Sequence, residues 1–175
     1  MFYNISTRRD ALMEYSFPPL IDTKSRILIL GSLPGVKSLE LNQYYAHPQN
    51  SFWKIMFVIF GVPFSKDYGT RCSMLLENGL ALWDVIKCAD RAGSSDSLIK
   101  NKTPNDVPGL LTKYRNISLI IYNGSCALTN YKKYFGEPPL PYMRLLSTSP
   151  ACAGKDVEKF KMWEETIKAN LNFNN

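Results

Sequence analysis

The chain has 175 residues, of which 45% are hydrophobic and 13% aromatic, and its formal net charge is +6. This length and composition exclude a disordered or fibrous protein and predict a domain large enough to bury a core. The excess of lysine and arginine suits a polyanionic partner such as nucleic acid, although many basic proteins bind none.

Four short apolar runs predict β-strands. They lie at residues 26–30 (RILIL), 80–85 (LALWDV), 118–122 (SLIIY) and 143–147 (MRLLS). Each run is nearly continuous and does not alternate with polar residues, which is typical of strands buried on both faces of a parallel sheet.

Helical patterns separate the strands. Asn50 is a candidate N-cap for a helix over residues 52–60, and Gly61 ends the apolar run of that helix. Further helices are expected over residues 70–77, from Asn105 or Asp106 to Tyr114, and over residues 125–135.

The last helix is expected over residues 156–171. Its apolar face is predicted at Val157, Phe160, Trp163, Ile167 and Leu171. Residues 91–102 are polar and contain glycine and serine, so we expect a surface loop there.

Strands that alternate with helices predict βαβ units. We therefore expect an α/β protein, a three-layer α-β-α sandwich around a four-stranded, mainly parallel sheet, in a single domain over residues 1–175. Ligands of such sheets bind beyond the carboxyl ends of the strands. Those ends lead into residues 31–35 (GSLPG), Asp84, Asn123 and residues 147–151 (STSPA). All four are polar or contain glycine or proline, so a site is predicted at this edge.

The first of these loops partly matches the phosphate-binding pattern G-x-x-x-x-G-K-[ST], at Gly31, Lys37 and Ser38. Two residues count against a nucleotide triphosphatase. Val36 replaces the glycine before the lysine, and Pro34 removes one of the backbone N–H groups that hold phosphates. A P-loop-like nucleotide hydrolase is therefore a remote alternative.

The same segment also brings aromatic rings and amides to the edge of the sheet. Tyr44 and Tyr45 precede AHPQNSFW, and a base flipped out of DNA needs flat aromatic partners with a few hydrogen-bonding groups. The last strand leads into LLSTSPA, whose hydroxyls and N–H groups can bind DNA phosphates. This combination favours a site for a damaged base.

The ordered motifs GSLPG, QYYAHPQNSFW, LALWDV, LIIYNG and LLSTSPA resemble the uracil-DNA glycosylase superfamily, and more narrowly its hypoxanthine-DNA (deoxyinosine) glycosylase branch. The resemblance runs from about residue 16 to about residue 151. It implies an enzyme of base excision repair that hydrolyses the N-glycosidic bond of a deaminated base and leaves an abasic site. Hypoxanthine is the favoured base, with uracil and xanthine as further candidates. A non-catalytic module that binds damaged DNA is the alternative.

Two residues depart from the wider superfamily. Leu33 stands where most members have an Asp or Asn that directs the attacking water. Ser147 stands where most have a His or Asn that supports the departing base. The resemblance instead points to Asn50 as the catalytic residue, because the hypoxanthine branch is thought to use an asparagine in this element. An amide can bind a water or a base edge, and capping of the next helix is the alternative role.

The resemblance implies base contacts for several other residues. Phe52 is expected to stack on the base, with a place in the core as its alternative, and Tyr45 is expected to form a pocket wall. His47, the only histidine, can lend positive charge to the leaving base or hydrogen-bond locally. Asp84 and Asn123 are expected to read the base edge or to brace the ends of their strands.

Backbone contacts complete the expected site. Contacts with the substrate are expected along the first turn, at Gly31, Ser32, Leu33, Pro34 and Gly35. Contacts with the DNA backbone are expected along the last, at Ser147, Thr148, Ser149, Pro150 and Ala151.

No metal and no cofactor are expected. The four cysteines, Cys72, Cys88, Cys126 and Cys152, include no C-x-x-C pair. No apolar run is long enough to span a bilayer, and the N-terminus lacks the apolar core of a signal peptide. We therefore expect a cytoplasmic, monomeric protein with access to DNA. The motifs themselves contain no lysine, and Lys37 and Lys54 lie just beyond two of them, so a Schiff-base lyase step is unsupported and a monofunctional enzyme is expected.

Overall fold

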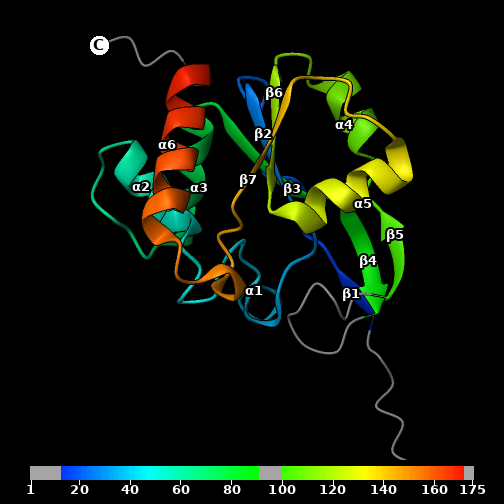
Figure 1. Cartoon of the computed structure of the whole chain (residues 1–175), viewed down its shortest axis with the longest axis horizontal. Helices are drawn as coiled ribbons and strands as arrows, with labels where there is room; N and C mark the ends of the chain where they lie inside the picture. Colours follow the sequence, from blue (N-terminus) through cyan, green and yellow to red (C-terminus); the bar gives the residue numbers. More distant parts are fainter. Residues whose placement is uncertain (1–12, 91–99, 172–175) are drawn as a thin grey trace, which may run out of the picture.

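The computed structural model describes residues 13–90 and 100–171, and a four-stranded parallel sheet lies at its centre (Figure 1). The strands are β2 (Ile27–Gly31), β3 (Leu80–Asp84), β6 (Leu119–Asn123) and β7 (Tyr142–Leu145). They lie in the order β3-β2-β6-β7, and each neighbouring pair is parallel. The apolar runs of the sequence are thus confirmed as strands of one parallel sheet.

Helices cover both faces of this sheet. Figure 1 shows α2, α3 and α6 on one side and α4 and α5 on the other, which confirms the three-layer sandwich. The helices are α1 (Val36–Leu41), α2 (Phe52–Ile59), α3 (Tyr68–Glu77), α4 (Val107–Lys113), α5 (Ser125–Phe135) and α6 (Asp156–Leu171), with a 3-10 helix at Pro150–Cys152.

The side chains of each central strand point alternately into two cores. Ile27 and Ile29 belong to the core beneath α2, α3 and α6, whereas Leu28 and Leu30 belong to the core beneath α4 and α5. All four side chains are completely buried. Burial on both faces is the reason that these runs are continuously apolar.

Local capping chemistry decides where two of the helices begin. The Asp67 carboxylate accepts a hydrogen bond from the backbone N–H of Thr70 at 2.7 Å, so α3 begins at Tyr68, two residues earlier than expected. Asp106 accepts from the backbone N–H of Gly109 at 2.9 Å and is therefore the cap of α4. The short helix α1 was not expected from the sequence.

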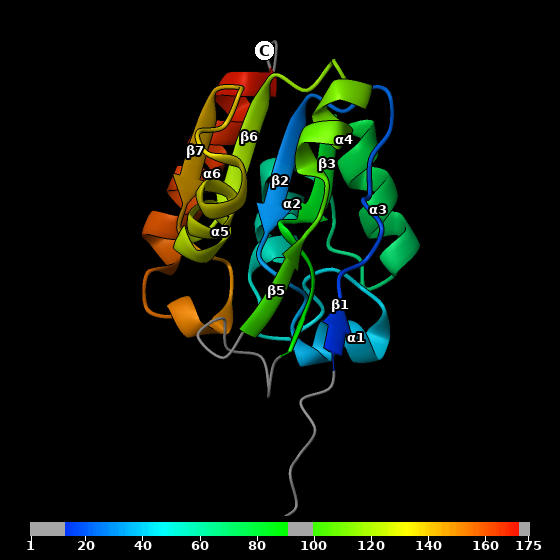
Figure 2. The same cartoon turned by 90° about the vertical axis from the view of Figure 1, so that its right-hand side faces the viewer.

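A second sheet was also not expected. Its strands are β1 (Met13–Tyr15), β4 (Ile86–Asp90) and β5 (Lys100–Pro104), which are antiparallel in the order β1-β4-β5. Figure 2 shows β1 and β5 toward the carboxyl end of the central sheet. Residues 100–102 of the expected loop therefore belong to β5, and residues 91–99 lie outside the described residues. Polar strands such as β5 (KNKTP) carry little hydrophobic signal, which is why this sheet was missed.

The expected apolar face of α6 is correct except at its first turn. Trp163 and Ile167 are fully buried, but Val157 is 85% exposed. Lys159 is buried in this first turn because its ammonium donates a hydrogen bond to the carbonyl of Cys152 at 3.0 Å. The turn therefore packs against residues 150–152 and not over the apolar core, which helical spacing alone cannot indicate. Within residues 13–90 and 100–171, no helix is long and apolar enough to cross a membrane.

Candidate active site

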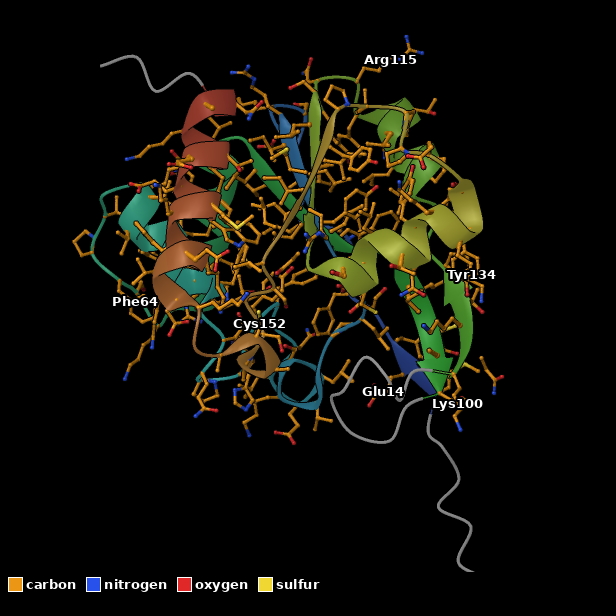
Figure 3. All side chains as sticks on the ribbon, viewed as in Figure 1. Glu14, Phe64, Lys100, Arg115, Tyr134 and Cys152 are labelled. Atoms are coloured by element: carbon orange, nitrogen blue, oxygen red, sulfur yellow. The ribbon has the colours of Figure 1, made fainter. Side chains whose placement is uncertain are left out.

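A cavity of about 560 Å³ opens at the carboxyl ends of the central strands. In Figure 3, Cys152 marks the turn that borders this end of the sheet. The cavity is lined by every predicted site residue except Phe52, namely Gly31, Ser32, Leu33, Pro34, Gly35, Tyr45, His47, Asn50, Asp84, Asn123, Ser147, Thr148, Ser149, Pro150 and Ala151. Residues far apart in sequence therefore meet at the predicted edge.

The floor of the cavity forms where β2 and β3 end side by side. Gly31 pairs with Asp84 in the parallel register. A Cβ atom on Gly31 would collide with Oδ1 of Asp84 and would lie 3.3 Å from Oη of Tyr45. Glycine is therefore needed at position 31, because the Asp84 carboxylate and the Tyr45 hydroxyl occupy the space that a side chain would fill. Asp84 is only 4% exposed.

The turn after β2 is held mainly through its backbone. The carbonyls of Gly31 and Ser32 accept hydrogen bonds from the N–H groups of Val85 and Ile86 at 2.9 and 3.0 Å. Leu33 is buried in the core beneath α4 and α5. Since its side chain is apolar and packed, Leu33 cannot direct a water molecule in the cavity.

The aromatic face of the cavity comes from Tyr45. Its ring packs on the ring of Phe52, with centroids 4.2 Å apart and planes 32° apart. Phe52 is completely buried and does not line the cavity, so in this structure its ring backs the ring of Tyr45, and its contact with the base stays a prediction. The backbone of Tyr45 has φ +54°, in the left-handed region that costs a non-glycine residue energy and often marks functional sites.

Tyr44 anchors this strained segment. Its hydroxyl donates to the carbonyl of Pro18 at 3.1 Å, and its own carbonyl accepts from Nε1 of Trp53 at 2.8 Å. Burial, and then the negative charge of Asp84, raise the pKa of the Tyr44 hydroxyl well above its ordinary value. The hydroxyl therefore stays protonated as a hydrogen-bond donor.

Asn50 lies two residues before the first residue of α2, and the N-cap of that helix is Ser51 and not Asn50 as expected. Oδ1 of Asn50 nevertheless accepts a hydrogen bond from the backbone N–H of Phe52 at 3.0 Å. This contact fixes which end of the amide faces the helix. Among residues 13–90 and 100–171, the Nδ2 group of Asn50 has no hydrogen-bond partner, so it is available to a molecule in the cavity.

His47 lies exposed at the mouth of the cavity. Its Nδ1 atom accepts a hydrogen bond from the backbone N–H of Gln49 at 3.2 Å. The local hydrogen bond considered from the sequence is therefore present.

The turn after β7 is clamped by a side chain from β6. Nδ2 of Asn123 donates to Oγ1 of Thr148, and the backbone N–H of Thr148 donates to Oδ1 of Asn123, both at 2.9 Å. The carbonyl of Thr148 accepts from the N–H of Ser51 at 3.1 Å. Thr148 is 1% exposed. Asn123 and Thr148 therefore hold the turn together. Thr148 is nearly buried, whereas Ser147, Ser149 and Ala151 are accessible, and the contact of these residues with the DNA backbone stays a prediction.

Lys159 holds the other end of the same turn and was missed by sequence reasoning. Its ammonium donates to the carbonyl of Cys152 at 3.0 Å and lies 3.4 Å from Oδ1 of Asp156. The carboxylate of Asp156 is largely exposed, whereas the lysine side chain is 3% exposed. A lysine on an amphipathic helix is ordinarily assigned to the solvated face, so no local signal points to this contact.

Four further residues line the cavity without having been predicted: Lys37, Ser38, Tyr44 and Cys152. Lys37 pairs with Glu40 at 2.7 Å on the exposed side of α1. The hydroxyl of Ser38 accepts from the N–H of Ala46 at 3.2 Å and shapes the loop. Since Lys37 is paired with a carboxylate, the arrangement does not favour the phosphate-binding alternative.

Comparison with known proteins agrees with this geometry. The model of the uracil DNA glycosylase superfamily matches residues 18–169. Hypoxanthine DNA glycosylases of Methanosarcina barkeri and Methanosarcina acetivorans are 40% and 37% identical to this chain over 114 residues, which cover 65% of this chain and 72% of each relative.

A solved structure is similar over nearly the whole chain. It is the solution NMR structure of a Methanosarcina acetivorans protein described as a uracil DNA glycosylase, with a TM-score of 0.79 and 31% identity, and the match covers 92% of this chain and 99% of that one. The chain belongs to the uracil DNA glycosylase superfamily. Within that superfamily it is an enzyme, a DNA glycosylase.

Proposed function

We propose that this protein is a monofunctional glycosylase that removes deaminated bases from DNA, hypoxanthine foremost and uracil or xanthine as further substrates, and leaves an abasic site. The observation that carries the proposal is the pairing of the Tyr45 ring, backed by Phe52, with the available amide of Asn50 in one cavity. The relatives named hypoxanthine DNA glycosylase support the choice of base.

The cavity suits a nucleotide flipped out of DNA. The base stacks on the face of Tyr45 that is not covered by Phe52, while its sugar and phosphates stay near the mouth. The accessible turn contacts the DNA backbone through Ser147, Ser149 and Ala151. The net positive charge of the chain attracts the phosphates. DNA that contains a damaged base is the proposed partner, and the chain acts as a monomer.

Base excision breaks the bond between C1′ of the sugar and the base nitrogen. The electron pair of that bond stays on the base, a water molecule adds to C1′, and its proton passes to the base or to solvent. A hydrogen-bond donor placed at the base stabilises the charge that develops there. Because Oδ1 of Asn50 is engaged by α2, its Nδ2–H group serves as this donor. Asn50 is thus the catalytic residue.

The lysine at the cavity is not suited to a lyase step, which supports hydrolysis alone. Among the described residues, Lys37 is the only lysine that lines the cavity, and it is paired with Glu40. A Schiff base needs an unprotonated amine at C1′, which an exposed lysine paired with a carboxylate does not supply.

The direct test is incubation of the protein with oligonucleotides that carry hypoxanthine, uracil or xanthine, in single- and double-stranded form, followed by alkali. Strand cleavage at the lesion that requires alkali is expected, with hypoxanthine released fastest. If the protein binds the lesion but releases no base, it acts as a binding module for damaged DNA and the proposed excision is refuted. Cleavage without alkali would contradict the monofunctional assignment.

Asn50→Ala tests the catalytic assignment. Loss of a preorganised hydrogen-bond donor is expected to slow excision by about 10²- to 10³-fold. The variant also loses the contact to Phe52 N–H, so a matched control is needed. Asp106→Ala removes the cap of α4, which lies outside the cavity, at a similar cost of about 1 kcal/mol. The control is expected to melt earlier yet excise normally. Equal activity of the two variants would refute the role of Asn50.

A further inference from the structure

The aromatic ring on the cavity wall stands on an unusual piece of backbone. Among the described residues, three residues other than glycine have a positive φ, namely Asn42 at +52°, Tyr45 at +54° and Asn101 at +48°. Asparagine tolerates this left-handed conformation, because its short side chain can hydrogen-bond locally, whereas tyrosine has no such compensation. Contacts from the surrounding structure must therefore hold Tyr45 in this conformation.

Two side chains fix the peptide groups on either side of Tyr45. Before it, the carbonyl of Tyr44 accepts a hydrogen bond from Nε1 of Trp53 at 2.8 Å. After it, the backbone N–H of Ala46 donates to Oγ of Ser38 at 3.2 Å. Because each peptide group is rigid, rotation about φ or ψ of Tyr45 would turn one of these groups and break its hydrogen bond. Trp53 and Ser38 together therefore set the backbone angles of Tyr45.

Both of these residues are buried, and they come from different helices. Ser38 lies on α1 and Trp53 lies on α2. Trp53 also reaches Tyr45 by a second route, because its ring packs edge-to-face against Phe52 with centroids 5.1 Å apart. Phe52 in turn backs the ring of Tyr45 at 4.2 Å. The backbone and the ring of Tyr45 are thus both held by side chains that are packed in place.

We propose that Ser38 and Trp53 are positioning residues that hold the Tyr45 ring in its stacking position before DNA binds, an inference that rests on the proposed function. The hydroxyl of Ser38 is engaged by Ala46, and Trp53 does not line the cavity. A ring that is already fixed loses little freedom when a base stacks on it, so more of the stacking energy is available to keep the nucleotide out of the DNA helix. The two residues therefore act on the flipped base and not on the glycosidic bond.

The first test is excision of hypoxanthine by Ser38→Ala in single turnover, with increasing excess of protein over the oligonucleotide. The maximal rate is expected to fall about fivefold, because one of the two hydrogen bonds that hold Tyr45 is lost. The protein concentration that gives half of this rate should change little, since the contacts with the DNA backbone are intact. Trp53→Phe removes the other hydrogen bond and is expected to act in the same way.

Ser25→Ala is the matched control. Ser25 is also buried, and its hydroxyl accepts from the backbone N–H of Asp22 at 3.2 Å, but it lies just before β2, at the end of the sheet opposite the cavity. The control also loses a hydrogen bond to Oδ1 of Asp22 at 2.9 Å. It is therefore expected to lose at least as much thermal stability as Ser38→Ala and yet to excise hypoxanthine at the wild-type rate.

A double variant separates positioning of the ring from a general structural role. Tyr45→Ala removes the ring that Ser38 is proposed to hold. Addition of Ser38→Ala to this variant should therefore cause no further fall in the maximal rate, although it should lower the melting temperature further. A structural role of Ser38 alone would not make its effect on the rate depend on the tyrosine ring.

Three results would overturn the inference. The first is a wild-type maximal rate in folded Ser38→Ala and Trp53→Phe, and the second is an equal loss of rate in Ser25→Ala. The third is a loss in the double variant that equals the product of the two single losses. Each of these leaves the proposed glycosylase intact, whereas absence of any excision by the wild-type protein overturns the proposed function and this inference together.

Discussion

The two turns that line the cavity are held in place by different means. The turn at residues 31–35 is fixed by backbone hydrogen bonds to Val85 and Ile86 and by the burial of Leu33. The turn at residues 147–152 is fixed by side chains from other elements, chiefly Asn123 and Lys159. A turn held by its own backbone tolerates apolar residues, whereas a turn held by distant side chains fails when one of them is removed. Neither turn contains Asn50, the proposed catalytic residue, or Asp84, the buried carboxylate at the floor of the cavity.

The largest effect is expected when the second turn loses its clamp. Asn123→Ala leaves the N–H and the hydroxyl of buried Thr148 without partners, so the free energy of unfolding should fall by about 3 kcal/mol. Thr148→Val removes one of the two contacts and is expected to have about half this effect. Urea unfolding measures both. Equal losses for the two variants would show that the backbone contact contributes nothing.

Leu33→Ala tests the first turn. Truncation of this buried side chain should lower the free energy of unfolding by about 2 kcal/mol, because the core loses packed methyl groups. Excision by the folded protein is expected to stay close to the wild-type rate at a temperature well below melting. A folded variant without activity would mean that the Leu33 side chain takes part in the chemistry.

Gly31→Ala tests the close approach at the floor. The new Cβ collides with the carboxylate of Asp84, and overpacking of this kind costs about 1–3 kcal/mol. Excision should fall as Asp84 and Tyr45 move. In the double variant Gly31→Ala/Asp84→Ala the collision is absent, so thermal stability should recover. An unaltered stability in the single variant would argue against this crowding.

The smallest effect is expected at Lys159. Lys159→Met keeps the length of the side chain but removes the donor to the Cys152 carbonyl, so DNA binding should weaken by about tenfold, seen as a higher KM with little change in kcat. Stability should change little, because a buried charge is removed at the same time. Lys161→Met removes the same charge from an exposed position of α6 and serves as the control. If both variants weaken DNA binding equally, Lys159 contributes only its positive charge and not its hydrogen bond to Cys152.

The sequence predicts the framework of the site better than the contacts within it. Residues 31–35, Asp84, Asn123 and residues 147–151 were expected at one edge and do line one cavity, because parallel strands bring their carboxyl ends together. Tyr45 was expected to form a pocket wall and does line the cavity, whereas Phe52, which was expected to stack on the base, lies buried against the Tyr45 ring. The backbone of Tyr45 is left-handed, and no pattern in the sequence predicts that conformation.

The sequence by itself determined the order of the central strands and of the helices between them along the chain. Hydrophobic runs and N-caps act between residues that are close in the sequence, so they can be recognised without the tertiary structure. Only the tertiary structure decided that Asn123 clamps Thr148 and that Lys159 supports the turn after β7. It also decided that Gly31 leaves room for Asp84 beside Tyr45. These contacts join segments that approach one another only when the sheet and its two helical layers pack, so no local pattern could specify them.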